Sequence, residues 1–201
     1  MAEDAIAVDL TEEDALRVQW YALLAKLLGA PADRETLSAL GGLKGTEGEL
    51  GQAVSALAAA ARASDPKTVE QEYFELFVGV GHGELVPFAS YYLTGFLHEK
   101  PLARLRGDMR LLGIAREESV KEPEDHIAAL CEMMAGLISG SFGRPADLAE
   151  QRRFFDTHVG CWAPRFFEDL QAARAARFYM PVGTIGRLFL AIESQAFEMA
   201  A

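Results

Sequence analysis

A short acidic segment, Glu122-Pro123-Glu124-Asp125-His126, carries side chains suited to recognising a basic group. A carboxylate there could accept two parallel hydrogen bonds from a guanidinium group, and the histidine could donate or accept another. Proline at a first helical position and acids in a first turn also favour helix initiation, so we predict a helix that begins at Pro123. On residue pattern alone, plain helix capping is the favoured interpretation. It leaves His126 unexplained, because a helix N-terminus disfavours an imidazolium.

A second group of residues combines aromatic and apolar side chains with a glycine-rich loop. The group comprises Tyr73, Leu76, Phe77, Gly79, Pro87, Ser90, Tyr91 and Tyr92. Aromatic residues at helical spacing are more often core than ligand pocket, so we expect Tyr73 and Phe77 to be core residues. The loop from Gly79 onward carries further glycines beside an apolar rim that includes Pro87. Such a loop is suited to admitting an apolar peptide segment.

Metal binding and catalysis find little support in the sequence. His158 and Cys161 are three residues apart and could share a helix face, with His126 and Cys131 as the only further candidate ligands. A structural zinc site usually needs four protein ligands, so we expect no metal, no cofactor and a histidine packed at a helix crossing. A helical metal-binding protein is kept as an alternative. The sequence lacks the nucleophile elbow, the P-loop and the dinucleotide-binding glycine pattern, so we predict no catalytic residue and no enzyme.

The elements that must position these residues are all predicted to be helical. Apolar residues recur at helical spacing from Leu16 to Phe197, and alternating β-branched runs are nearly absent. We expect Thr11 to cap the first helix, Asp65-Pro66 to start another, Pro164 to mark a boundary, and the last helix to follow Pro181. The prediction is one all-α domain over residues 1–201, an irregular multi-helix bundle with flexible loops near 41–51 and 79–90.

Composition narrows the classes of partner. The 201 residues are 50% hydrophobic and 24% charged, with a formal net charge of −11. Such a charge opposes nucleic-acid binding and favours basic partners. The N-terminus has no signal-peptide pattern and no window is apolar enough for a membrane span, so we expect a cytoplasmic protein without stable membrane insertion. Cys131 and Cys161 form no secreted-type framework, and we predict that both are buried free thiols.

Three ordered motifs in this chain resemble those of the TorD/DmsD family of redox-enzyme maturation chaperones. They are Y-x-x-L-F-x-G at residues 73–79, P-x-x-S-x-Y at 87–92 and E-P-x-D-H at 122–126. The resemblance spans about Leu16 to Ile192 and implies an all-α fold. It also implies that the protein binds the twin-arginine signal peptide of an apo-molybdoenzyme and assists its cofactor insertion before export. The molybdopterin-cofactor machinery would be a further partner, and the protein would be a monomer or a domain-swapped dimer.

The resemblance also implies which residues bind the peptide. Asp125 and His126, with Glu122 and Pro123, would supply polar recognition, while apolar contact would come from Leu76, Phe77, Pro87, Ser90 and Tyr91. We expect these residues to line one groove between the loop from Gly79 to Tyr91 and the helix start at Pro123. A nitrate-reductase assembly chaperone of the related NarJ type is an alternative, since it would bind a different client by similar physics.

Overall fold

The computed structural model describes residues 10–115 and 122–200, and this part of the chain is helical with no β-strand. The predicted all-α fold class is confirmed. The elements, with η marking π-helical stretches, are α1 (Glu12–Gly29), α2 (Arg34–Gly41), α3 (Glu49–Ala63), α4 (Pro66–Tyr73), η1 (Phe74–Val78), α5 (Ala89–Thr94), α6 (Lys100–Leu111), α7 (Ile127–Ser139), α8 (Leu148–Phe154), η2 (Phe155–Val159), α9 (Ala163–Ala172) and α10 (Tyr179–Met199).

Several helices begin where the sequence carries its own start signal. The Thr11 hydroxyl accepts the Asp14 N–H at 3.0 Å, and Asp65 accepts the N–H groups of Lys67 and Thr68. Both caps satisfy amides that have no partner within the helix, so both predicted starts are confirmed. The last helix begins at Tyr179, so the prediction that it follows Pro181 was late by a fraction of a turn.

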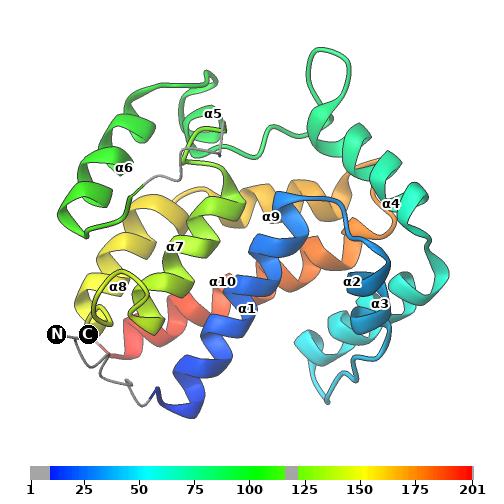
Figure 1. Ribbon diagram of the computed structural model, residues 1–201, viewed down its shortest axis with the longest axis horizontal. Coiled ribbons are helices and arrows are strands. Elements are labelled where there is room, and N and C mark those ends of the chain that lie inside the picture. Colours follow the sequence, from blue (N-terminus) through cyan, green and yellow to red (C-terminus); the bar gives the residue numbers. More distant parts are fainter. Residues whose placement is uncertain (1–9, 116–121, 201) are drawn as a thin grey trace, which may run out of the picture.

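Helix packing centres on α1, α7, α9 and α10. α1 lies along α7, and α10 packs against α9 and α3, while α2 covers α3 (Figure 1). The α9–α10 contact is close because α10 carries glycines where it meets α9. A Cβ placed on Gly186 would lie 2.2 Å from the Phe167 ring. Fully buried aromatic and aliphatic side chains such as Tyr21, Phe166 and Leu24 fill the space between these helices and supply the main apolar stabilisation.

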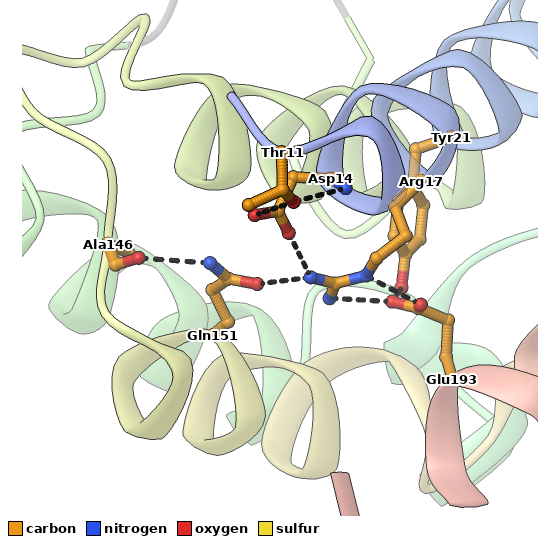
Figure 2. A network of polar contacts seen from close by, with 7 residues as sticks. All are labelled: Thr11, Asp14, Arg17, Tyr21, Ala146, Gln151 and Glu193. Carbon is orange, nitrogen blue, oxygen red and sulfur yellow. Dashed lines mark hydrogen bonds and ion pairs between the residues drawn. The ribbon is translucent and has the colours of Figure 1, made fainter. Parts of the chain in front are cut away.

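A polar network joins α1, α8 and α10 within this apolar setting. The Arg17 guanidinium donates to both carboxylate oxygens of Glu193, at 2.8 and 3.0 Å, and also to Asp14 and Gln151 (Figure 2). The Tyr21 hydroxyl donates to Glu193 at 3.0 Å. Because Glu193 is only 2% exposed, these hydrogen bonds compensate for burying its carboxylate.

One local expectation was wrong, and another stays a prediction. Cys131 is buried as predicted, but Cys161 is exposed, because it lies in the turn between η2 and α9. The two loops predicted to be flexible correspond to the non-helical stretches 42–48 and 79–88. Their flexibility remains a prediction.

Candidate functional site

The acidic segment forms a turn that precedes α7. The helix begins at Ile127 with His126 as its N-cap, so the prediction that it begins at Pro123 was wrong. The His126 N–H donates to the Pro123 carbonyl at 3.2 Å, which closes the turn. Its conformation is set by pairing with residues 87–90, which are far away in sequence. A local pattern of proline and acids does not reveal such a contact.

Residues 87–90 and 125–127 pair in an antiparallel manner, and we call this pairing the joint. The Ile127 N–H donates to the Pro87 carbonyl at 2.9 Å, and the Ala89 N–H donates to the Asp125 carbonyl at 3.0 Å. Between these bonds lies the antiparallel bridge Phe88–His126, whose rings meet edge to face at 4.9 Å. The second and third motifs of the sequence therefore meet in one structural unit.

Asp125 lies at the centre of the joint and is only 1% exposed. Its Oδ2 accepts the Ser90 N–H at 2.7 Å. That amide belongs to the first turn of α5, so Asp125 caps a helix from which it is remote in sequence. Among the residues that the structure describes, neither the buried Asp125 Oδ1 nor the buried Ser90 Oγ has a hydrogen-bond partner.

His126 is nearly buried and caps α7 with its side chain. Its Nδ1 accepts the Ala128 N–H at 3.1 Å. Desolvation lowers the pKa of His126 from 6.5 to about 4. Near neutral pH the ring is therefore uncharged, and the proton is on Nε2 because Nδ1 is an acceptor. This explains why a histidine is tolerated at a helix N-terminus.

Glu124 ties the turn to α6. Two N–H groups of Arg106 donate to Glu124 Oε2, at 3.0 and 2.8 Å. The Glu124 side chain is 9% exposed, whereas that of Arg106 is 46% exposed. The pair therefore fixes the outer side of the turn against the middle of α6.

A groove of about 840 Å³ runs between α1 and α7 and ends at the acidic turn. Small residues such as Ala22 and Ala129 line it together with larger apolar side chains such as Met133 and Phe142. Glu122, Pro123, Glu124 and His126 form its end, and Glu132 and Lys26 lie along its length. Three of the four Lys, Arg, Asp or Glu residues in this lining are therefore glutamates.

A second cavity, of about 330 Å³, lies beyond the joint, among α5, α6, α7 and η2. Ala89, Asp125 and His158 line it, with Lys100 and Arg104 among the lining residues. Glu124 and His126 line the groove, whereas Asp125, which lies between them in the turn, lines the second cavity. The joint is the wall between the two cavities.

The structure brings only part of the predicted site together. Asp125, His126, Pro87 and Ser90 meet in the joint. Leu76 is 0% exposed, Phe77 packs against Tyr73 and Tyr179, and Tyr91 is 42% exposed. The linings of the groove and the second cavity contain none of Leu76, Phe77, Pro87, Ser90 and Tyr91. The peptide-binding role of all nine residues remains a prediction.

The loop after η1 has a fixed closure at its base. The Glu84 and Leu85 N–H groups donate to the carbonyls of Glu75 and Leu76, at 3.0 and 2.8 Å. Gly79 has φ +60°, and a Cβ there would meet the His82 carbonyl oxygen at 2.0 Å. Glycine is therefore required at this position by the turn itself.

The α1 and α7 surfaces of the groove were not predicted from the sequence. The available signal was small residues at helical spacing, namely Ala22, Ala25 and Gly29 on α1 with Ala128, Ala129 and Gly136 on α7. Facing small residues leave space between two helices, but the same spacing also permits close helix packing. Unless the position of the acidic turn is known, a sequence with this spacing does not show whether the helices leave a groove or pack closely.

His158 and Cys161, the candidate ligands of the alternative metal-binding interpretation, have other partners. His158 Nε2 lies 2.7 Å from Asp108 Oδ2, and the Cys161 thiol donates to the Thr157 carbonyl. Within residues 10–115 and 122–200, no three His, Cys, Asp or Glu side chains are grouped so that they could hold a metal ion. Over the same ranges, no helix is long and apolar enough to cross a membrane.

The chain matches the model of a known protein family. The model of the family described as "Nitrate reductase delta subunit" matches residues 44–168, so the chain belongs to that family, which also includes the TorD proteins that its motifs resemble. The matched range contains the joint and the acidic turn. It excludes α1, which supplies one side of the groove.

Individual proteins similar to this chain are named TorD chaperones. The chain is 28% identical over 131 residues to "Chaperone protein TorD" of Vibrio parahaemolyticus, a match that covers 61% of each protein. It is 31% identical to the protein of that name in Salmonella bongori, over 59% of this chain and 54% of the relative. The matches therefore span about three fifths of these relatives at most.

The fold has a counterpart among solved structures. A putative redox enzyme maturation protein from Archaeoglobus fulgidus superposes with a TM-score of 0.57 and 16% identity. The superposition covers 94% of this chain and 99% of that one. This likeness extends the shared fold over nearly the whole chain.

Proposed function

We propose that this chain is a redox-enzyme maturation chaperone that makes and breaks no bond. Its ligand is the twin-arginine signal peptide of a molybdopterin-containing oxidoreductase, and it assists cofactor insertion in the cytoplasm before export. Family membership and the TorD relatives support the chaperone class. The groove between α1 and α7 is the observation that supports peptide binding.

The groove has the two properties that such a peptide requires. Twin-arginine signal peptides combine a basic start with an apolar stretch. The groove is apolar along α1 and α7, and it ends at a turn with Glu122 and Glu124. The formal net charge of −11 also attracts a basic ligand over longer range. We therefore place the apolar stretch along the helices and the basic start toward the acidic turn.

A bulky side chain in the groove tests this placement. Ala22 is exposed on α1 and lines the groove, so Ala22→Trp fills the groove without disturbing the core. We expect it to weaken the binding of a twin-arginine peptide, measured by isothermal titration calorimetry, by about tenfold or more, a loss of about 1.4 kcal/mol. Ala59→Trp, at an exposed position of α3, is the matched control. Equal affinities of the two variants would exclude the groove as the binding site.

The client class is tested with a panel of peptides from the molybdoenzymes of the same genome. Relatives named TorD favour a TorD-type client, whereas membership in the nitrate reductase delta subunit family favours the NarJ-type alternative. Tight binding of a twin-arginine signal peptide would support the first. Preference for the N-terminal segment of a nitrate reductase would support the second, and binding of neither would overturn the proposed function.

A further inference from the structure

We infer that the joint is a gate, and that Asp125 becomes available to a ligand only when residues 87–90 separate from 125–127. In the open state, Asp125 Oδ1 and Ser90 Oγ would accept hydrogen bonds from a guanidinium group. The identity of that ligand, an arginine of the bound peptide, rests on the proposed function. The gate itself does not.

The closed joint leaves two buried polar atoms without partners at one place. Asp125 Oδ1 and Ser90 Oγ have none among the residues that the structure describes, although their residues are joined by the 2.7 Å bond from the Ser90 N–H. A buried polar group without a hydrogen bond destabilises the state that buries it. Two such groups in one contact lower the cost of opening it, relative to a similar contact in which every polar atom has a partner.

In the part of the chain that the structure describes, few polar and aromatic contacts join the two sides of the joint. They are three hydrogen bonds, from the N–H groups of Ala89, Ser90 and Ile127, and one ring contact between Phe88 and His126, and the side chains of Ala89 and Ile127 are also buried in the core. α5 has only six residues, and Asp125 supplies the acceptor for an amide in its first turn. Opening the joint would therefore displace mainly the short helix α5, which Tyr92 also holds through ring contacts with Trp162 and Phe166 and a hydrogen bond to Asp169.

The position of the joint gives its opening a consequence for binding. Glu124 and His126 face the groove, whereas Asp125 faces the second cavity. While the joint is closed, a peptide in the groove meets the turn but does not reach Asp125. When it opens, the two cavities connect, and a basic side chain at the end of the groove can reach Asp125. A gate of this kind would couple the separation of residues 87–90 from 125–127 to the binding of a guanidinium group by Asp125.

Hydrogen–deuterium exchange of the free protein tests the gate without any ligand. We expect the amides of Ala89, Ser90 and Ile127 to exchange together and faster than the amide of Met134, in the buried middle of α7. Ser90→Ala removes one unpartnered polar atom from the closed state, so it should slow exchange at the joint by about tenfold. Ser55→Ala, at an exposed site of α3, should leave the joint unchanged. Exchange of the joint amides at the rate of Met134, or no slowing by Ser90→Ala, would overturn the gate.

A peptide with an arginine pair before an apolar segment tests the ligand, with its lysine-pair version as control. Saturation with the arginine peptide should speed exchange at Ala89 and Ile127, and Ser90→Ala should weaken its binding by about tenfold. Binding that leaves these two amides as slow as before would overturn the gate as a ligand-controlled device. Failure of any peptide to bind would overturn the proposed function, while the experiment on the free protein would still decide the gate.

Discussion

His126 shows how one side chain can serve both capping and recognition. Its Nδ1 accepts the Ala128 N–H, which caps α7, and its ring packs against Phe88 across the joint. The neutral ring keeps Nε2–H as a donor, and His126 lines the groove. The plain capping interpretation of the acidic segment therefore holds for the histidine, which the sequence analysis had left unexplained. Recognition of a peptide carbonyl by Nε2–H is compatible with that cap.

The depressed pKa of His126 predicts a loss of stability in acid. The pKa of His126 is about 4 in the folded protein and 6.5 in the unfolded chain. Between pH 4 and pH 6.5 the unfolded chain therefore binds more protons. The stability from the neutral ring is present in full above pH 6.5 and lost as pH falls through 4. The loss is roughly 3 kcal/mol at one pKa unit per 1.36 kcal/mol.

Urea denaturation of His126→Asn at several pH values measures this contribution, since asparagine can cap the helix but does not titrate. We expect the variant to lose less stability than the unaltered protein between pH 7 and pH 4. His158, whose pKa burial also lowers, titrates in both proteins and cancels in the comparison. Parallel pH curves for the two proteins would refute the assignment.

At the scale of elements, several helix starts in this fold are capped by a side chain, which is either local or a carboxylate distant in sequence. α10 has no side-chain cap of its own. Glu72 of α4 accepts the N–H groups of Arg177, Phe178 and Tyr179, at 2.8, 3.0 and 2.8 Å, and is only 7% exposed. Asp125 does the same for α5. Glu72 thus fixes α4 to the start of α10, and Asp125 fixes the acidic turn to the start of α5. Apolar packing alone is less directional than these hydrogen bonds.

Glu72→Gln should therefore destabilise the protein by about 2 kcal/mol, because the amide nitrogen of glutamine cannot accept a backbone N–H. The free energy of unfolding in urea measures the effect. The control is Glu75→Gln on η1, where the exposed carboxylate accepts only from the Gln71 side chain in the described structure. A loss no larger than that of the control would show that Glu72 does not hold the start of α10.

The sequence predicts elements whose signals are local and misses those that depend on distant partners. Thr11 and Asp65 cap helices through residues two or three positions away, so their starts were predictable. The turn at Pro123 is shaped by residues 87–90, and its proline and acids gave the wrong helix start. The groove needs two facing helices, so its position could not follow from either helix alone. Asp125, His126, Pro87 and Ser90 were predicted as site residues and meet at the joint, but their closed arrangement required the structure.

At the scale of the whole molecule, the Arg17 network joins helices from both ends of the chain (Figure 2). α1 supplies Arg17 and Tyr21, α8 supplies Gln151, and α10 supplies Glu193. Arg17 also lies over the Phe197 ring, 5.3 Å from its centroid. Since α1 forms one side of the groove, this network also positions the proposed peptide site.

Breaking one partner of the network should cost more than removing both charges. Arg17→Met leaves the Glu193 carboxylate buried without its cation and should destabilise the protein by about 3 kcal/mol or more. Adding Glu193→Gln removes that charge, so the double variant should recover part of the loss. Urea denaturation of the two single variants and the double variant gives the coupling energy. Arg165→Met, from the exposed pair with Asp169, is the control and should cost less than about 1 kcal/mol. Additive effects of the Arg17 and Glu193 changes would mean that the network does not act as a unit.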